Sequence, residues 1–459
     1  MTANNQGQID KEKKDMGTFV KDLFGGNLFK GDKGVWMIYF FLCMISLVEV
    51  YSASSRLTFE GGHHWGPMVS QAGFLLLGLI VILFVHRIPC KWFMLFPFLL
   101  LPMAIILLLY TAVLGGGSNI NETHRWVSIG SISFQPSEIA KAALLMTTAV
   151  VLAKTQTEKE EMVKGKKRKV VGAIKGKRYL AFAIVGGATL LICGLIFLDN
   201  VSTALMLFFV VVVMMFIGQV PKDLMFKGLM TIFGIGAFFV ATSFAVPDST
   251  LKEIPGCKRV VTVKQRILRK IGNTDEMAKQ NPHKSDTQIL LNDKNSQTTY
   301  ASIAIANSDL IGLGPGNSIQ RDFLQHAESD FIYAIIVEEL GIAGAFFVAF
   351  LYLVLLIRVG RIAQRCPSFF PAYLVLGFGI MMVLQAFVNM SVAVGLFPVT
   401  GQTLPLISKG GTSILITSFY IGVILSVSRY AEKKEQKAPL VEAALNGETS
   451  EYYTDGSMS

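Results

Sequence analysis

Long apolar runs are the feature that most constrains what this chain can fold into. Ten stretches each approach or exceed the roughly 20 residues that a helix needs to cross a bilayer. Their apolar residues are continuous and do not alternate with period two, which predicts helices and not the strands of a barrel. Because 52% of the 459 residues are apolar and only 16% are charged, we expect an all-α polytopic membrane protein. The predicted spans are residues 35–53, 67–85, 92–114, 136–153, 180–198, 201–218, 225–246, 331–357, 369–392 and 406–428.

The placement of the basic residues predicts an orientation. The chain carries a net charge of +10, and its Lys and Arg residues gather in alternate short connections, above all between 154 and 178. The positive-inside rule then places both termini in the cytoplasm. The cluster Lys164–Lys169 is read as a topology determinant beside anionic lipid, and not as a nucleic-acid site. The expected parts are a cytoplasmic tail at 1–34, a ten-helix domain at 35–428 with a large external loop at about 247–330 between helices 7 and 8, and a cytoplasmic tail at 429–459.

The cysteines and the N-terminus add little chemistry. Five cysteines are present, an odd number, and no CxxC motif suggests a zinc or redox site, so no protein metal site is expected. The first 34 residues contain no apolar core of a cleavable signal, so the first span is expected to be an uncleaved anchor.

The first polar stretch is HRWVSIGSISFQPSEIAKAALL, residues 124–145, which leads into the fourth span. Glu138 and Lys141 are three residues apart and share one face of the predicted helix. One interpretation is a local ion pair that neutralises two charges near a helix end. The other is a polar floor beneath a bound headgroup, with Arg125 and Lys141 supplying positive charge to an anion.

The second stretch closes the long external loop and enters the eighth span. Its glycines, in GLGPGNSIQRDFL, predict a tight turn more than a phosphate loop, because no Lys-Ser/Thr follows at the required spacing. Carboxylates follow in SDFIYAIIVEELGIAG. Asp330 is expected at the outer start of the helix, either as a helix N-cap or as a chemical group. Glu338 and Glu339 lie two to three turns deeper and are expected to pair with buried cations or to pack polar junctions.

The third stretch is NMSVAVGLFPVTGQTLPLISKGGTSIL, residues 389–415, between the ninth and tenth spans. Its prolines and glycines require an irregular backbone, which is tolerated at membrane depth only where protein or a water-filled cavity covers it. The alternatives are a kinked hairpin and the wall of an outward-facing cavity.

Four motifs, RWVSIGSISFQPSEIAK, GLGPGNSIQRDFL, SDFIYAIIVEELGIAG and PVTGQTLPLISKGGTS, together resemble the SEDS family (shape, elongation, division and sporulation). Members of that family, such as FtsW, RodA and SpoVE, build or are linked to peptidoglycan, and FtsW and RodA polymerise glycan strands from lipid II. The resemblance covers nearly the whole chain, and ten spans with a large external loop before the eighth match the family's layout. The YSAS after the first span and the long charged tails are more similar to FtsW. The chain departs from the family's usual residues in LQHAESD, DNVST and KGGTS.

The resemblance implies a peptidoglycan glycosyltransferase that acts in cell division. The implied reaction is inverting transfer of a glycan from an undecaprenyl diphosphate donor, with Asp330 as general base and cations near the departing diphosphate. No cofactor is required by the resemblance, and Mg²⁺ or Mn²⁺ is an option at the diphosphate. The expected substrate-binding residues are Arg125, Glu138, Lys141, Gln320, Arg321, Ser408 and Lys409.

The implied partners are lipid II and undecaprenyl-diphosphate-linked glycan, a class B penicillin-binding protein that acts as transpeptidase, other divisome proteins and membrane lipid, with no nucleic acid. The implied place is the bacterial cytoplasmic (inner) membrane at the division septum. Two alternatives stay open, a lipid II flippase or other transporter, since charges inside a membrane also mark translocation paths, and a RodA-type elongation polymerase.

Overall fold

The structure is a computed structural model of the whole chain. It describes residues 29–54, 65–112, 118–120, 123–129, 132–163, 166–173, 177–231, 234, 296–324 and 326–445.

Within these ranges, eight helical segments are long and apolar enough to cross a membrane. They are α2 (Lys33–Ala53), α4 (Gly66–Val85), the pair α5 (Cys90–Phe93) and α6 (Phe96–Ala112), α7 (Pro136–Lys154), α8 (Lys177–Asp199), α16 (Ile332–Arg365), α17 (Phe369–Ala393) and α18 (Gly411–Leu445). A ninth apolar helix, α9 (Val201–Ile217), is shorter, and residues 222–231 begin the predicted seventh span, which continues outside the described residues. The prediction of a polytopic, essentially all-helical protein is therefore confirmed.

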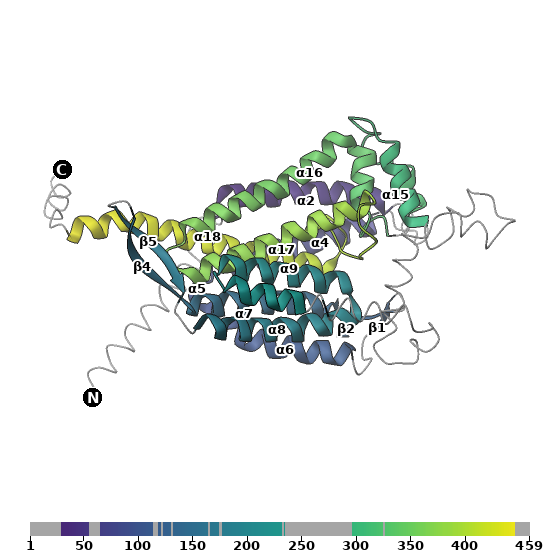
Figure 1. Ribbon diagram of the computed structural model, residues 1–459. Coiled ribbons are helices and arrows are strands. Elements are labelled where there is room, and N and C mark those ends of the chain that lie inside the picture. The colour runs from purple at the N-terminus through teal and green to yellow at the C-terminus, as the bar shows by residue number, and fades with distance from the viewer. Residues whose placement is uncertain are drawn as a thin grey trace, which may run out of the picture.

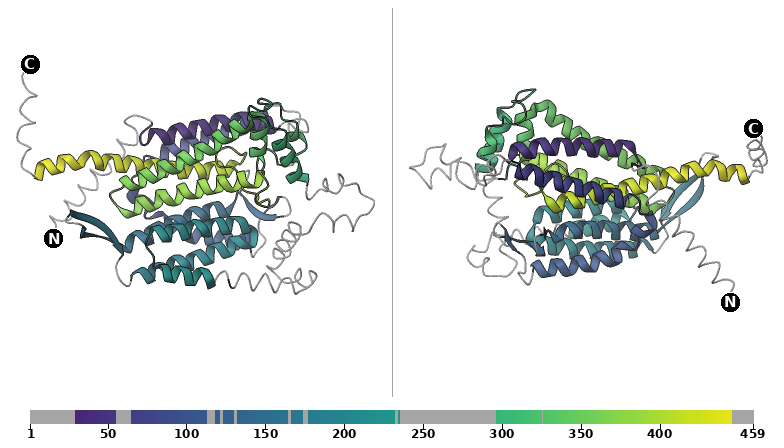
Figure 2. Two further views of the ribbon diagram at one scale, coloured as in Figure 1. Left: turned by 45° about the horizontal axis from the view of Figure 1, so that its top comes forward. Right: turned by 180° about the vertical axis from the view of Figure 1, so that it is seen from behind.

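The long helices run side by side along a common direction (Figures 1 and 2). Helix α16 packs against both α2 and α17, α4 packs against α18, and α7 lies between α6 and α17. Helix α15 (Ser296–Ala306) lies beyond one end of the bundle and packs on α16, whereas the last turns of α18 project beyond the other end. The polar stretches of the sequence that flank α16 and α18 therefore meet at the α15 end.

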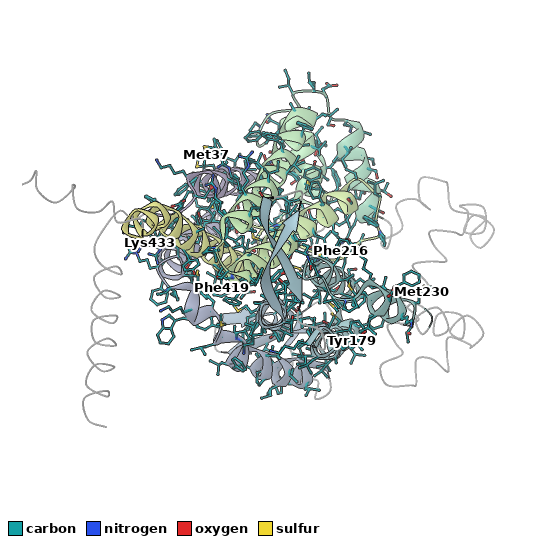
Figure 3. All side chains as sticks on the ribbon, turned by 60° about the vertical axis from the view of Figure 1, so that its left-hand side comes forward. Met37, Tyr179, Phe216, Met230, Phe419 and Lys433 are labelled. Atoms are coloured by element: carbon teal, nitrogen blue, oxygen red, sulfur yellow. The ribbon has the colours of Figure 1, made fainter. Side chains whose placement is uncertain are left out.

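The outer surface of the bundle is apolar, as a lipid-facing surface requires. Met37, Tyr179, Phe216 and Met230, which are labelled in Figure 3, are each more than half exposed. Polar side chains from the spans are instead buried between helices. An unsatisfied polar group costs on the order of several kcal/mol in lipid, where no water can bind it. The burial of polar side chains between the helices avoids this cost and concentrates the polar chemistry inside the bundle.

Two small antiparallel sheets lie at the helix ends, and the apolar pattern did not predict them. Strands β1 (Ser118–Ile120), β2 (Thr123–Ile129) and β3 (Ile132–Phe134) form one sheet, with Val127 opposite Phe134. Strands β4 (Gln156–Val163) and β5 (Lys166–Ala173) form a hairpin at the end from which α18 projects (Figure 1). The basic cluster of β5 is thus on the opposite end from α15. Which end faces the cytoplasm stays a prediction from charge.

The tenth span begins later than predicted. We expected a helix from 406, but α18 begins at Gly411, because residues 402–409 form a separate buried turn in which Leu406 has a φ of +66°. Its other end extends to Leu445, well past the predicted end at 428. Helix α16 is also interrupted, since Gly341 has φ 72° and ψ −175°.

Candidate functional site

Asp330 occupies the turn that precedes α16. The helix begins at Ile332, and Phe331 is its N-cap, without a capping side-chain hydrogen bond. Asp330 thus lies one residue before the cap, and its side chain is half-buried. The interpretation of Asp330 as the helix N-cap is therefore wrong, and the turn that carries it is held by contacts of its main chain.

Helix α17 anchors the Asp330 turn through one amide side chain. Asn389 donates from Nδ2 to the carbonyl of Asp330 at 2.9 Å and to the carbonyl of Gln402 at 2.7 Å. Gln402 in turn donates to Thr203 Oγ1, at the start of α9, at 2.7 Å. A single buried side chain therefore links the turn before α16, the segment before α18 and, through Gln402, helix α9.

The same turn is bound directly to the segment before α18. Ser408 donates from Oγ to the carbonyl of Ser329 at 2.6 Å, and the amide of Lys409 donates to the carbonyl of Glu328 at 2.8 Å. These bonds bring Ser408 and Lys409 to the turn that carries Asp330, although about 80 residues separate them from it in the sequence. Lys409 is half-buried, and because its own backbone binds the turn, its side chain is the cation that this contact brings to the site.

The irregular backbone at 402–409 is covered by protein, as its depth requires. Its carbonyls accept hydrogen bonds from side chains of the surrounding helices: Gln385 to Thr403 at 3.0 Å, Ser46 to Ile407 at 2.9 Å, and the Tyr352 hydroxyl to Pro405. Ser408 Oγ also accepts from the amide of Leu404 at 2.7 Å. These contacts give the segment a fixed shape without regular secondary structure.

Glu138 and Lys141 form the expected ion pair, with Lys141 Nζ 2.7 Å from Glu138 Oε1. The Lys141 side chain is fully buried, whereas that of Glu138 is 12% exposed. Lys141 also donates to Gln385 Oε1 at 3.1 Å, and Gln385 bonds Thr403. The local ion pair is therefore present, and it contacts the 402–409 segment through Gln385. Arg125 lies on β2, but its side chain is outside what the structure describes.

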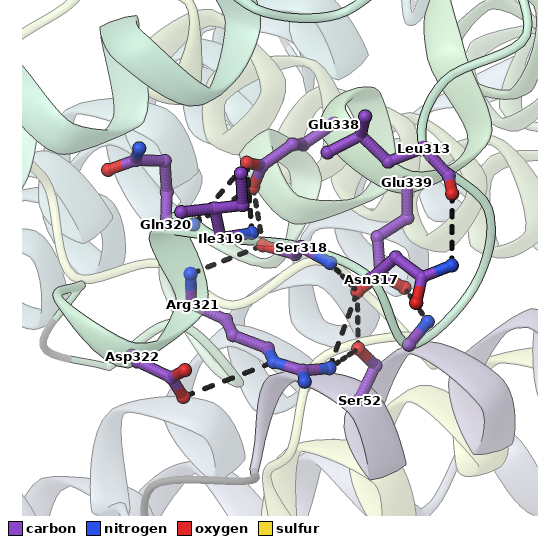
Figure 4. Close-up of polar contacts among 11 residues, drawn as sticks. Ser52, Leu313, Asn317, Ser318, Ile319, Gln320, Arg321, Asp322, Glu338 and Glu339 are labelled. Carbon is purple, nitrogen blue, oxygen red and sulfur yellow. Dashed lines mark hydrogen bonds and ion pairs between the residues drawn. The ribbon is translucent and has the colours of Figure 1, made fainter.

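The two deeper glutamates hold the loop that precedes the Asp330 turn (Figure 4). Both are fully buried on the first half of α16. Glu338 accepts from the hydroxyl of Ser318 and from the amides of Ile319 and Gln320, at 3.1 and 3.3 Å. These donors fold residues 318–320 onto the helix, so Glu338 has the architectural role that its depth predicted.

Glu339 completes this arrangement from the other side. It accepts from the amides of Gly316 and Ser318, at 2.9 and 3.1 Å, and from the hydroxyl of Ser52 on α2. Arg321 Nη1 lies 3.8 Å from Glu339 Oε1 and donates to Ser52 Oγ at 2.8 Å. Gln320 and Arg321, predicted as substrate ligands, are thus tied to Glu338, Glu339 and α2. We call residues 316–321 with these two glutamates and Ser52 the glutamate clamp.

The glycines form a turn that interrupts α16. Gly312, Gly314 and Gly316 all have positive φ, and an added Cβ at Gly312 would lie 2.3 Å from the backbone nitrogen of Gly341. Across this contact the amides of Leu313 and Gly314 bond the carbonyls of Glu338 and Glu339 at 3.0 and 2.8 Å. The Gly316 amide is engaged by an internal carboxylate, so the glycine turn is confirmed and the phosphate loop is not supported.

The structure therefore divides the predicted site residues into three sets. In the first set, Ser408 and Lys409 bind the backbone of Ser329 and Glu328, next to Asp330. In the second, Glu138 and Lys141 connect to the 402–409 segment through Gln385. In the third, Gln320 and Arg321 belong to the glutamate clamp. Sequence reasoning missed the amide side chains that make these connections, which are Gln385, Asn389 and Gln402. For Gln385 and Asn389 a signal was available, because a Gln or Asn inside an apolar span is costly and usually functional.

The site offers few protein ligands for a metal. Among the described residues, no group of three or more His, Cys, Asp and Glu is placed to hold an ion. A Mg²⁺ ion at a diphosphate, however, needs only one or two carboxylates in addition to the substrate oxygens. Glu328 and Asp330 are the acids at the turn, and they fit this limited requirement.

Fold and site define a class: a multi-pass helical membrane protein whose polar groups converge at one end of the bundle. Comparison with known families identifies it further. The chain belongs to the FtsW/RodA/SpoVE family of cell cycle proteins, whose model matches residues 33–433. The resemblance expected from the four motifs is confirmed.

Relatives cover most of the chain. The probable peptidoglycan glycosyltransferase FtsW of Nitrosococcus halophilus is 33% identical over 84% of this chain and 87% of its own length. Stage V sporulation protein E of Bacillus subtilis is 28% identical over 86% and 96%. Among solved structures, Thermus thermophilus rod shape determining protein RodA matches with a TM-score of 0.56 at 23% identity, over 87% of this chain and 97% of that one. A chain of a peptidoglycan synthase complex matches with a TM-score of 0.63, also at 23% identity, over 87% and 98%.

Proposed function

We propose that this chain is a peptidoglycan glycosyltransferase that polymerises glycan strands from lipid II during cell division. Membership of the family and the names of its FtsW relatives, which include those of Nitrosomonas europaea and Haemophilus influenzae, support the activity and the division role. The observation that carries the assignment to a site is the direct binding of the Asp330 turn to the Ser408–Lys409 segment.

Asp330 acts as general base in this proposal. Glycan transfer from an undecaprenyl diphosphate donor needs a base within hydrogen-bond reach of the acceptor hydroxyl. Asp330 suits this role, because its main chain is held by Asn389 while its side chain stays partly accessible at the end of the bundle. A carboxylate ahead of a helix is also stabilised in its ionised form by the positive end of the helix dipole.

The leaving diphosphate needs positive charge near it. Lys409 is our first candidate, because its backbone is bound to the same turn as Asp330. Lys141 is fully buried and paired, so it contributes from below the site without direct contact in this conformation. Arg125, on strand β2, is a further candidate from the sequence, and Arg321 serves the glutamate clamp in addition to any contact with substrate. If Mg²⁺ or Mn²⁺ takes part, Glu328 and Asp330 would hold it, and it would neutralise charge on the diphosphate.

A class B penicillin-binding protein is the proposed partner, since a solved complex with the same fold couples polymerization with crosslinking. We further propose that the protein works with other divisome proteins in the bacterial inner membrane, at the septum. Its apolar outer surface supports only the membrane part of this statement.

The test is Asp330→Asn in a polymerisation assay with purified protein, partner and labelled lipid II. Removal of a general base costs about 100- to 10,000-fold in rate. The matched control is Asp309→Asn, the same chemical change on an exposed residue of the same end, which should leave the rate within a few-fold. Asp330→Asn protein that makes glycan strands at nearly the wild-type rate would refute the catalytic assignment.

A lipid II flippase is the second candidate, because the interrupted helix α16 is a feature that transporters also show. In this chain, however, the interruption is filled by residues 309–314 of the same protein. A flipping assay beside the polymerisation assay separates the two: loss of flipping with intact polymerisation in the Asp330 variant would favour the transporter.

A further inference from the structure

Glu49 lies in the last part of the apolar helix α2, in the sequence ISLVEVYSA. Its side chain is fully buried, and neither carboxyl oxygen has a hydrogen-bond partner among the described residues. No motif of the site includes it, and the proposed glycosyl transfer does not use it. A carboxyl group placed so deep and left without donors requires a physical explanation.

Glu49 faces the glutamate clamp. Ser52, three residues further along α2 and on the same face of the helix, donates to Glu339. Glu49 itself lies within electrostatic range of Glu339. The other charged groups at this end of the elements that pack on α2 are Glu338 on α16 and Arg321 and Asp322 on η1 (Gln320–Asp322). Helix α4, which also packs on α2, contains no ionisable residue between Gly66 and Val85.

The charges of this cluster do not balance if every acid is ionised. Three fully buried carboxyl groups, those of Glu49, Glu338 and Glu339, belong to this cluster. Its one guanidinium, that of Arg321, lies 3.8 Å from Glu339 and 3.9 Å from Asp322. Glu338 and Glu339 each accept hydrogen bonds from backbone amides and a hydroxyl, which stabilise their charged forms. Glu49 has no such donors among the described residues, so neither solvent nor any described partner stabilises its charged form.

We propose that Glu49 is an intramembrane proton-binding site, which carries a proton at neutral pH and whose ionisation would release the glutamate clamp. As the neutral acid, Glu49 adds no negative charge to this contact between α2 and α16. Loss of the proton to solvent breaks the O–H bond and places a second negative charge beside Glu339. Repulsion then opposes the hold of Glu339 on Gly316 and Ser318. This inference stands independently of the proposed transferase activity.

Infrared spectroscopy of the protein in lipid nanodiscs tests the protonation directly. At neutral pH, the difference between wild type and Glu49→Gln should contain the carbonyl stretch of a protonated carboxylic acid, with the shift that deuterium exchange causes. The control is Glu138→Gln, which should not remove this band, because Glu138 is ion-paired with Lys141. If Glu49→Gln removes carboxylate bands and leaves the acid band unchanged, Glu49 is ionised and the proposal is overturned.

Thermal unfolding in the same nanodiscs tests the link to the clamp. The melting temperature of wild type should fall as the pH rises from neutral to alkaline. That of Glu49→Gln, which mimics the neutral acid, should fall much less. Glu49→Met, an apolar substitution of similar length, should behave like Glu49→Gln and covers the case that one variant folds poorly. Equal alkaline losses in all three proteins would refute the coupling. An alkaline loss in wild type that Na⁺ but not choline prevents would assign the site to a metal cation and overturn the proton assignment.

Discussion

Replacement of Lys141 by Met should strongly destabilise the protein. The substitution keeps the length of the side chain but removes the only charge within salt-bridge distance of Glu138, at 2.7 Å, among the described residues. Stranding one member of a buried pair costs about 3–5 kcal/mol. Gln385 Oε1 also loses its donor, which is worth about 1–3 kcal/mol. Because the two contacts share Lys141, these costs overlap and do not add, so we expect about 3–5 kcal/mol in total.

Unfolding by SDS in mixed micelles, followed by circular dichroism, measures this free energy. The control Lys91→Met removes an exposed lysine and should stay within about 0.5 kcal/mol of wild type. The double variant Lys141→Met with Glu138→Leu should recover most of the loss, since apolar residues often replace a buried pair without net cost. The reasoning fails if the single variant is as stable as wild type, or if the double variant is no more stable than the single one.

Three further predictions follow from local geometry and charge. Gly341→Ala should destabilise the docking of residues 309–314 by at least about 1–3 kcal/mol, because φ is +72° and the new Cβ would lie 2.5 Å from backbone atoms. The control Gly187→Ala, with open space around it, should be neutral or stabilising. The rate of proteolysis within residues 309–314 measures the effect of each variant. Burial lowers the pKa of His86 below its usual 6.5, so the folded state resists a proton that the unfolded chain accepts. The contribution of neutral His86 to the free energy of unfolding should be fully present above about pH 6.5 and should fall as the pH drops below it. The melting temperature of His86→Gln should therefore depend less on pH than that of wild type. In a cysteine-free background, a reporter cysteine at exposed Leu310 should react with an impermeant reagent in intact cells, while one at Lys167 should not; the reverse pattern would invert the predicted topology.

Helix α17 shows how far sequence reasoning reached in the site. Its apolar length predicted a span, and its Gln385 and Asn389 were visible as polar exceptions. Their partners were not predictable, because Asn389 bonds Asp330, which lies 59 residues away, and Gln385 bonds Lys141, at a separation of 244 residues. Proximity of this kind depends on which helices become neighbours, and apolar periodicity leaves that choice open.

The sequence by itself determined that this protein is a helical membrane protein of its family and that Asp330 stands near the start of a span. Those features depend on the length of apolar runs and on local motifs, which each segment carries alone. Only the tertiary structure decided that Phe331, and not Asp330, caps α16, that Gly341 interrupts this helix, and that Glu339 reaches Ser52 across 287 residues. The physical reason is that a buried polar group must find a partner wherever packing brings one, so its role is set by neighbours that are distant in the chain.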